Sequence, residues 1–289
     1  MTHIAALRGL LAARPRRLLS VPGCWDGLTA LLIEQAGFEA AFLSGAGLSI
    51  ASLGRPDMGL VTANEVSNVI AAIRDRVAIP LIVDGDTGFG NALNMARTVR
   101  AFERAGASAI QIEDQGFPKR CGHMAGKSVV PLAEAVGKLR AALDARHDML
   151  VIARTDALAI EGFDAAMERV EAYRVAGADL VFVEGPQAMA ELEAIAARFA
   201  TTVPLVHNLV EGGVTPTDSG AVLESLGFAV ALHPLMLMHG LVRAAPGWLE
   251  SLRQTRGTSA LGGTLARLPE LNALVGLADL TTEGKRYGG

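Results

Sequence analysis

Residues 80–113, PLIVDGDTGFGNALNMARTVRAFERAGASAIQIE, decide the fold because they hold one complete strand–helix–strand unit. The runs Pro80–Asp84 and Ala109–Glu113 are short and almost wholly apolar, which is typical of parallel strands that are buried on both faces. Between them, Ala92–Ala105 is rich in alanine and stops at Gly106, a residue that often ends a helix. The stretch therefore predicts two parallel strands joined by a helix.

The same unit recurs along the chain and predicts an α/β fold. Apolar runs alternate with helical stretches, and we expect a (β/α)₈ TIM-type barrel over residues 1–246. A doubly wound open sheet is the alternative, because alternation alone does not show that the sheet closes. The other expected strands are Arg17–Val21, Ala40–Ser44, Leu150–Ala153, Leu180–Glu184, Pro204–Asn208 and Ala229–His233, and the other expected helices include Leu132–Ala145, Phe163–Ala176 and Met189–Phe199.

The alternation stops near residue 247, and we expect residues 247–289 to form a C-terminal helical extension. Trp248–Thr255 is expected to be one helix and Leu271–Ala278 another. The extension is too apolar to be simply disordered. It therefore packs either on its own barrel or on a neighbouring subunit.

Composition argues against several classes of protein. The 289 residues carry a formal net charge of −4, whereas nucleic-acid-binding domains usually present a basic face. Two cysteines, Cys24 and Cys121, cannot build a disulfide framework, which favours a reducing compartment. No apolar run approaches the roughly 20 residues that cross a bilayer, and the N-terminus lacks a signal-peptide pattern. We expect a cytoplasmic protein that binds neither nucleic acid nor membranes.

Acidic residues close the third and fourth expected strands. In a barrel the active site lies where the strands end, so Asp84, Asp86 and Glu113 should meet there. Asp84 and Asp86 are two positions apart, which on an extended strand points both side chains to one side. Such oxygen ligands suit Mg²⁺ better than zinc, and converging carboxylates that lack an internal cation would need one. The alternative is that both aspartates only cap the next helix or stabilise the glycine-rich turn.

Polar residues at the other strand ends are candidate substrate ligands. Arg154 could bind a carboxylate bidentately, or it could form a structural ion pair with Asp156 or Glu184. Asn208 could hydrogen-bond a substrate or form a turn. The segment Ser44-Gly45-Ala46-Gly47 could offer backbone N–H groups to an anion or be a plain tight turn.

The stretch PKRCGHMAGK, residues 118–127, combines a thiol with several cations and two glycines. Such a segment buries little, so its residue types are better explained by chemistry than by packing. The cations Lys119, Arg120, His123 and Lys127 favour the thiolate of Cys121, which could act as a nucleophile or as a general acid–base. We favour proton transfer, because no Cys–His–Asn/Asp set is demonstrable. A bystander surface cysteine is the alternative.

Four motifs together resemble the isocitrate lyase/phosphoenolpyruvate mutase superfamily. They are Asp84-Gly85-Asp86, Glu113-Asp114-Gln115, the loop residues 118–123 and Ala153-Arg154-Thr155-Asp156. The resemblance extends from about Val21 to Pro234. It implies a barrel enzyme with Mg²⁺ or Mn²⁺, and a homotetramer in which neighbouring subunits exchange a C-terminal helix.

The resemblance also implies roles for single residues. The metal would be surrounded by Asp57, Asp84, Asp86 and Glu113, and the catalytic residues would be Cys121, Lys119, His123, Glu113 and Arg154. The substrate would be held by Ser44, Gly45, Ala46, Arg120, Gly122, Glu184, Asn208 and Pro234, beneath a gating loop formed by residues 119–127.

With a cysteine in this loop, the chain resembles the carbon–carbon lyases of the superfamily. The run from Asn208 to Pro216 resembles the 2-methylisocitrate and 2,3-dimethylmalate lyase branch. That branch implies Mg²⁺-dependent retro-aldol (Claisen-type) cleavage of a 2-hydroxy dicarboxylate to pyruvate and a second acid, with Cys121 as general acid. The chain departs from the usual pattern at Gly85, where alanine is common, and at Phe42 and Gln111. The alternatives are carboxyphosphonoenolpyruvate phosphonomutase-like P–C chemistry, oxaloacetate decarboxylation, and a catalytically silent barrel.

Overall fold

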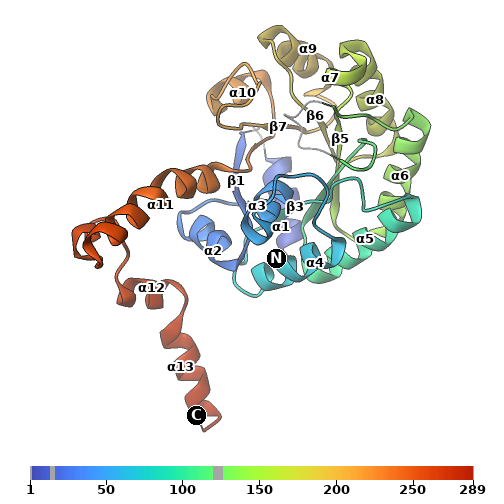
Figure 1. Cartoon of the computed structure of the whole chain (residues 1–289). Helices are drawn as coiled ribbons and strands as arrows, with labels where there is room; N and C mark the ends of the chain where they lie inside the picture. The colour runs from blue at the N-terminus through green and yellow to red at the C-terminus, as the bar shows by residue number, and fades with distance from the viewer. Residues whose placement is uncertain (1, 14–16, 120–125, 289) are drawn as a thin grey trace. The chain divides into compact units, whose positions relative to one another are not determined.

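A computed structural model describes residues 2–13, 17–119 and 126–288. Within these ranges, eight parallel strands follow one another around a closed barrel, seen with its surrounding helices in Figure 1. The last strand, β8, pairs with the first, β1. The predicted (β/α)₈ barrel is confirmed, and the open sheet is excluded. The strands are β1 (Leu19–Cys24), β2 (Ala41–Leu43), β3 (Leu81–Asp84), β4 (Ala109–Glu113), β5 (Leu150–Thr155), β6 (Leu180–Val183), β7 (Leu205–Asn208) and β8 (Val230–His233).

Helices lie around the outside of the barrel and connect successive strands (Figure 1). Helix α5 has the predicted bounds because local residues cap it. The Asn91 side chain accepts hydrogen bonds from the N–H groups of Leu93 and Asn94, and the helix stops at Gly106, whose φ is 108°. The connecting helices are α2 (Gly27–Gln35), α3 (Gly45–Leu53), α4 (Ala63–Arg74), α5 (Ala92–Ala105), α6 (Leu132–Ala145), α7 (Leu158–Glu161), α8 (Phe163–Ala176), α9 (Met189–Phe199) and α10 (Gly220–Leu226).

The first helix, α1 (His3–Ala12), shares the apolar core of the barrel. Its Leu7 and Leu11 are buried in one cluster with Leu19 and Leu150, which are the first residues of β1 and β5. Helix α1 therefore packs against the N-terminal ends of the strands. The opposite ends, where barrel enzymes carry their active sites, are left for polar side chains.

The strand bounds differ from the prediction mainly in β1, which runs to Cys24 instead of ending at Val21. Proline lacks the N–H group that a central strand uses, yet Pro22 still pairs in register with His233 of β8. Beyond it, Gly23 and Cys24 pair with β2. Because barrel strands are tilted and staggered, β1 changes its neighbour along its length and continues past the proline.

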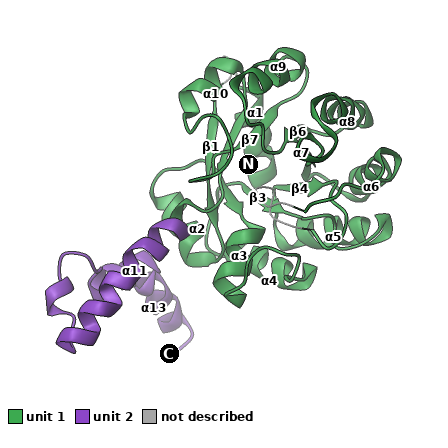
Figure 2. Cartoon of the chain, turned by 45° about the horizontal axis from the view of Figure 1, so that its top comes forward, with its two compact units in different colours: residues 1–237 green, residues 238–289 purple. Residues whose placement is uncertain are grey.

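The chain divides into two compact units, residues 1–237 and residues 238–289 (Figure 2). Helix α11 (Met236–Thr255) contains the predicted helix Trp248–Thr255 and starts before it, so the expected boundary after residue 246 falls inside α11. A short 3₁₀ turn, η1 (Ser259–Leu261), follows α11.

The predicted helix Leu271–Ala278 is wrong. Helices α12 (Leu268–Leu274) and α13 (Leu277–Arg286) are separated by Gly276, whose left-handed φ of 79° interrupts a right-handed helix. In the part of the chain that the structure describes, none of the helices combines the length and hydropathy needed to pass through a bilayer.

Candidate active site

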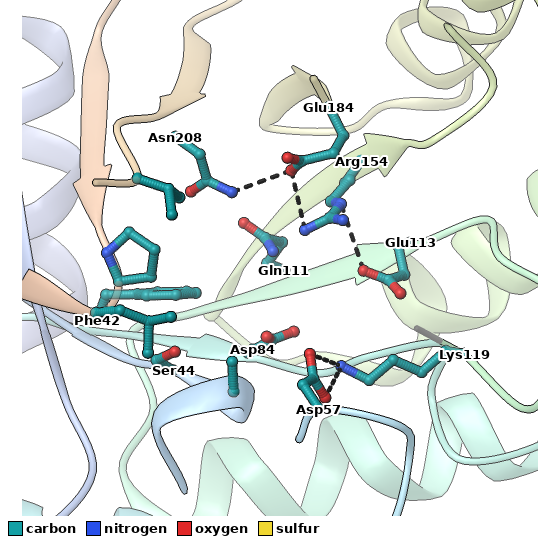
Figure 3. A pocket seen from close by; sticks show the side chains of 14 residues that line it. Phe42, Ser44, Asp57, Asp84, Gln111, Glu113, Lys119, Arg154, Glu184 and Asn208 are labelled. Carbon is teal, nitrogen blue, oxygen red and sulfur yellow. Dashed lines mark hydrogen bonds and ion pairs between the residues drawn. The ribbon is translucent and has the colours of Figure 1, made fainter. Parts of the chain in front are cut away.

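A pocket lies at the carboxyl ends of the barrel strands (Figure 3). Asp84, Glu113 and Asn208 are the last residues of β3, β4 and β7, while Ser44 and Glu184 directly follow β2 and β6. The sequence predicted this arrangement from the polar residue that closes each apolar run. The pocket is lined by Phe42, Ser44, Ala46, Asp57, Asp84, Gln111, Glu113, Lys119, Arg154, Glu184, Asn208, Val210, Pro234 and Leu235.

Most of the predicted site residues therefore meet in this pocket. Arg120, Cys121, Gly122 and His123 lie outside the described residues, so their roles stay predictions. Val210 and Leu235 were not among the predicted site residues, because an apolar side chain in a strand-end loop carries no chemical signal. A positional signal existed: Val210 is two residues past Asn208, and Leu235 directly follows Pro234.

Two carboxylates converge beside Gly45 at the start of α3. A Cβ atom at Gly45 would lie 2.9 Å from Asp84 Oδ2 and 3.4 Å from Asp86 Oδ1, so both oxygens border the same small space. The predicted reason for this convergence is wrong, since β3 ends at Asp84 and Asp86 has a left-handed φ of 48°. The chain turns after Asp84, and the Asp86 N–H donates to Asp84 Oδ1 at 3.2 Å. A tight turn, not an extended strand, brings the pair together.

Backbone N–H groups at the N-terminus of α3 already donate hydrogen bonds to nearby side chains. The Gly45 N–H donates to Asp84 Oδ2 at 3.3 Å, and the Gly47 N–H donates to Ser44 Oγ at 3.1 Å. Two of the N–H groups that the sequence offered to an anion are therefore already used. The segment is an N-capped helix start, neither a plain turn nor an open anion cradle.

Lys119 lies among the acidic side chains and is almost fully buried. Its Nζ is 2.8 Å from Asp57 Oδ2 and 2.5 Å from Asp86 Oδ1 (the Asp57 contact is drawn in Figure 3). Burial alone would lower the pKa of Lys119, but the carboxylates around it, with Asp86 foremost, raise that pKa well above its usual value. The lysine is therefore charged. The expectation that Asp84, Asp86 and Glu113 lack an internal cation is wrong for Asp86, which Lys119 contacts, and for Glu113, whose Oε2 is 3.4 Å from Arg154 Nε.

Asp86 shares this lysine with other acids. Burial raises the pKa of Asp86 to about 7, with Lys119 opposing the shift and the charges of Asp84 and Asp57 adding to it. Burial likewise raises the pKa of Glu113 well above its usual value, although Arg154 opposes that shift. The single ammonium group of Lys119 is too little positive charge to balance the carboxylates on this side of the pocket.

Arg154 lies between Glu113 and Glu184 on the other side of the pocket (Figure 3). Its Nε and Nη2 bind Asp156 Oδ2 and Oδ1 at 2.9 and 3.0 Å, and its Nη1 is 3.1 Å from Glu184 Oε2. Nε is also 3.4 Å from Glu113 Oε2. Burial alone would lower the pKa of Arg154, but these acids raise it well above its usual value. Arg154 forms the structural ion pair foreseen as its alternative role, and it also lines the pocket.

The two lysines that flank residues 120–126 are not exposed, contrary to the expectation that this stretch buries little. The Lys119 and Lys127 side chains are each 4% exposed. Lys127 Nζ bonds Asp156 Oδ1 at 2.8 Å. The sequence showed their charge but not the buried acids that draw both side chains inward.

Negative charge exceeds positive charge around the pocket. Six carboxylates and three cations belong to the described side chains that line the pocket, pair with its lining, or, as Lys127 does, pair with one of those partners. The carboxylates are Asp57, Asp84, Asp86, Glu113, Asp156 and Glu184, and the cations are Lys119, Lys127 and Arg154. Such an excess of buried carboxylates is costly unless bound protons or a further cation balance it.

Several buried oxygen atoms near the pocket lack a hydrogen-bond donor among the described residues. Gln111 Oε1, Glu113 Oε1 and Asn208 Oδ1 are buried, and none has a hydrogen-bond partner within residues 2–13, 17–119 and 126–288. Mg²⁺ takes one or two carboxylates directly and keeps water molecules, which would donate to such acceptors. The residues present therefore fit a hydrated divalent cation.

The predicted cage of four carboxylates is not preformed. In the described ranges, no three acidic, cysteine or histidine side chains gather closely enough to hold an ion together. Asp84 and Asp86 converge, whereas Asp57 is turned to Lys119 and Glu113 to Arg154. The internal cations account for the difference, because Arg154 pairs with Glu113 while Lys119 pairs with Asp57 and also with Asp86.

Comparison with known proteins places these residues in context. A family model described as phosphoenolpyruvate phosphomutase matches residues 8–247. The chain is 40% identical to 2,3-dimethylmalate lyase of Eubacterium barkeri, over 99% of both chains. It is 39% identical to 2-methylisocitrate lyase of Aeropyrum pernix, over 91% of this chain and 85% of that one. It is also 41% identical to the chloroplastic carboxyvinyl-carboxyphosphonate phosphorylmutase of Arabidopsis thaliana, over 90% and 78%.

Solved structures show the same fold over the whole chain. A 2,3-dimethylmalate lyase, called a PEP mutase/isocitrate lyase superfamily member, superposes with a TM-score of 0.93 at 33% identity and covers 100% of this chain and 96% of its own. An oxaloacetate acetylhydrolase with the inhibitor 3,3-difluorooxalacetate has a TM-score of 0.93 at 32% identity, with coverage of 100% and 98%. A phosphonopyruvate hydrolase with oxalate and Mg²⁺ has a TM-score of 0.89 at 32% identity and covers 100% of both chains.

Proposed function

Because the chain belongs to the phosphoenolpyruvate mutase/isocitrate lyase superfamily, we propose that it is a carbon–carbon lyase acting on a 2-hydroxy dicarboxylate. The substrate would be of the 2,3-dimethylmalate or 2-methylisocitrate type, cleaved to pyruvate and a second carboxylic acid. The observation that carries the proposal is the division of one pocket into two halves. Asp84 and Asp86 make one half rich in oxygen and short of positive charge, and Arg154 faces it from the other.

The oxygen-rich half fits a divalent cation, Mg²⁺ or Mn²⁺, held by Asp84 and Asp86 with Asp57 and Glu113 nearby. When bound, the ion would act as a Lewis acid toward the hydroxyl and carboxylate oxygens of the substrate. A superfamily structure with oxalate and Mg²⁺ supports this assignment.

The chain's own side chains would hold the pyruvate half. Arg154 lines the pocket, where its Nη1 pairs with Glu184 Oε2 at 3.1 Å, and a substrate carboxylate would bind its guanidinium there. Asn208 donates Nδ2 to Glu184 Oε2 at 3.0 Å, which orients its Oδ1 as an acceptor for a substrate hydroxyl. Ser44 Oγ already accepts the Gly47 N–H, so its hydroxyl hydrogen remains to be donated to the substrate. With Gly45 and Ala46, it would form the floor of the site.

Cys121 is proposed as the general acid. A pocket carboxylate such as Glu113 would take the proton of the substrate hydroxyl, whose oxygen becomes the carbonyl oxygen of pyruvate as the carbon–carbon bond breaks. The electron pair of that bond stays on the departing acid as a carbanion, and the Cys121 thiol would protonate it. Lys119, Arg120 and His123 would stabilise the negative charge that develops on the second carboxylate. Cys121, Arg120 and His123 lie outside the described residues. The support from the structure is that Lys119 pairs with Asp57 in the pocket and Lys127 pairs with Asp156, the partner of Arg154.

A panel assay tests the proposal. With Mg²⁺ present, we expect pyruvate from 2,3-dimethylmalate or 2-methylisocitrate, at rates well above that from isocitrate, which would yield glyoxylate. Chelation of the metal should abolish the reaction. Failure to form an α-keto acid from any of these substrates, with correctly folded and metal-loaded protein, would exclude the lyase.

Two other activities belong in the same panel. The relatives that act on carboxyphosphonates and phosphonopyruvate favour P–C chemistry as a second candidate, and the oxaloacetate acetylhydrolase favours oxaloacetate as a third substrate. Phosphonopyruvate and oxaloacetate, assayed beside the dicarboxylates, separate the three. Faster turnover of either one would replace the proposed reaction.

Metal affinity should depend on pH near neutrality. Burial raises the pKa of Asp86 to about 7, so a proton competes with the metal for this carboxylate well above the pH at which an exposed aspartate is protonated. We expect Mg²⁺ affinity to fall by about tenfold from about pH 8 to about pH 6. Calorimetric titration in two buffers of different ionisation enthalpy measures both the affinity and the protons released. An affinity that is constant over this range, without proton release, would contradict the role of Asp86.

The second unit, residues 238–289, is proposed to mediate a homotetramer through an exchanged helix. Its leucines are widely exposed for an isolated chain: Leu249 is 65% exposed and Leu252 43%. We expect the double change Leu249→Glu and Leu252→Glu to reduce the solution mass to that of a smaller oligomer, because buried charge is costly at an apolar contact. Light scattering after size exclusion measures the mass. Gln254→Glu, which adds charge on the same helix, should leave it unchanged, and a monomeric wild type would refute the assembly.

A further inference from the structure

Asp156, which directly follows β5, is fully buried and binds two cations at once. Its Oδ2 accepts the Arg154 Nε hydrogen at 2.9 Å, while its Oδ1 accepts from Arg154 Nη2 at 3.0 Å and from Lys127 Nζ at 2.8 Å. One oxygen is therefore shared between a cation that lines the pocket and one that does not. Burial alone would raise the pKa of Asp156, but Arg154 and Lys127 hold it below its usual value. The carboxylate is charged at neutral pH.

Asp114 accepts a hydrogen bond from the backbone of Asp156 and is itself held by several side chains. The Asp156 N–H donates to Asp114 Oδ1 at 2.9 Å. The other oxygen of Asp114 accepts from Thr155 Oγ1 at 2.6 Å, Tyr173 OH at 2.7 Å and Arg169 Nη1 at 3.2 Å. Tyr173 and Arg169 belong to α8, so this network ties the turn after β5 to a helix outside the barrel. A buried network with this many partners leaves the turn little freedom.

The chain segment that carries Lys127 reaches the same network. The Val130 N–H donates to the Asp114 carbonyl at 2.9 Å, and the Gly116 N–H donates to the Ser128 carbonyl at 2.8 Å. Residues 114–116 and 128–130 thus lie side by side as two short antiparallel segments. Arg169 Nη2 also donates to the Val130 carbonyl at 3.0 Å. The backbone next to Lys127 is therefore held by hydrogen bonds, and the Lys127 side chain extends from it to Asp156.

We propose that Asp156 is a positioning residue for Arg154, and that Lys127 influences substrate binding through Asp156. The bidentate contact fixes the plane of the guanidinium, whose Nη1 pairs with the pocket residue Glu184 at 3.1 Å. The Lys127 ammonium in turn holds the shared oxygen in place. The inference rests on the proposed function in one respect, namely that Arg154 binds a carboxylate of the substrate.

Asp156→Asn is the first test. Asparagine has the same shape, but its NH₂ group would face the N–H groups of Arg154 or the ammonium of Lys127, so the guanidinium loses its fixed orientation. With oxalate and Mg²⁺ as the probe, we expect calorimetry to show affinity weakened by about 10- to 100-fold. KM for the cleaved dicarboxylate should rise in parallel, while kcat changes by only a few-fold. Unchanged oxalate affinity would overturn the proposal.

A double-mutant cycle tests the route from Lys127. Lys127→Met should weaken oxalate binding by about fivefold in the wild type, but by less than about twofold in the Asp156→Asn background. Lys127→Arg should restore most of the affinity, because it keeps the charge at Asp156. Equal effects of Lys127→Met in both backgrounds would show that the lysine acts directly or only on stability. If Asp156→Asn does not fold, the comparison of Lys127→Met with Lys127→Arg tests the role of Lys127 by itself. Equal oxalate affinity of these two variants would refute that role.

Glu171→Gln on α8 is the matched control. Glu171 binds Arg174 through the same Nε and Nη2 atoms, at 2.9 and 2.6 Å, but on the surface and away from the pocket. The Glu171→Gln variant should bind oxalate with wild-type affinity and keep the wild-type KM. A wild type that binds oxalate but cleaves no substrate would exclude the lyase and leave this binding test intact. A wild type that binds no oxalate with Mg²⁺ would overturn the inference, since Arg154 would then hold no carboxylate.

Discussion

Asp84→Asn should lower Mg²⁺-dependent turnover by about 10³-fold or more. Asp84 supplies one of the two carboxylates that converge beside Gly45, and its oxygens are oriented by the N–H groups of Gly45 and Asp86. Asparagine removes the charge and turns an NH₂ group toward one of these donors. Lewis-acid stabilisation of several kcal/mol would be lost, and about 4 kcal/mol corresponds to three powers of ten in rate.

Turnover at saturating Mg²⁺, together with calorimetric Mg²⁺ affinity, measures this effect. Asp26→Asn is the matched control, because Asp26 also follows a strand end but caps α2 by accepting the Thr29 N–H at 2.7 Å. Asparagine caps a helix equally well, so this variant should keep turnover within about twofold of the wild type. An Asp84→Asn protein with near-normal activity would remove Asp84 from the site.

Cys121→Ala should lower kcat by about 10²- to 10⁴-fold, the usual contribution of a general acid. The thiol is needed only when the carbanion is protonated. Oxalate and Mg²⁺ binding, which we assign to Arg154, Asn208 and the aspartates, should therefore stay within a few-fold of wild-type values. A loss of kcat without a loss of binding locates the effect in the chemical step.

Cys24→Ala controls for the loss of a thiol. Cys24 is buried at the end of β1, its Sγ is 3.5 Å from the Phe42 carbonyl, and burial raises its pKa, so it is a neutral packing residue. Its removal should affect stability more than turnover. Full activity of Cys121→Ala toward dicarboxylates would assign the proton to another donor. Full activity toward oxaloacetate alone would favour decarboxylation.

Helix ends and the strand order were predictable because their signals are local. Helix α8 ends at Gly177, whose φ is 103°, as the glycine in the sequence indicated. The prediction for Leu271–Ala278 failed because Gly276 was taken as a helical residue, although its backbone is left-handed. Closure of the barrel was an inference from alternation, and the pairing of Leu19 with Val230 across the chain established it.

The candidate site was predictable as a set of residues but not as a set of contacts. A polar residue at the end of an apolar run identified Asp84, Glu113, Arg154 and Asn208. Nothing local indicated that Lys119 would pair with Asp57, which lies 62 positions earlier. The sequence also placed Asp84 and Asp86 on a common strand, whereas a turn with a left-handed Asp86 brings them together.

Residue identity and order were enough to predict the barrel, its superfamily and the side chains at its mouth. Periodicity, helix caps and acidic or basic character are properties of short stretches, so they can be read along the chain. The sequence offered Asp156 and Glu184 as partners of Arg154, but which acids neutralise Lys119 and Lys127 was decided only by the folded structure, since those acids come from distant segments. Burial makes an unpaired charge costly, so these pairings depend on distance and solvent exclusion, which arise only once the barrel has closed.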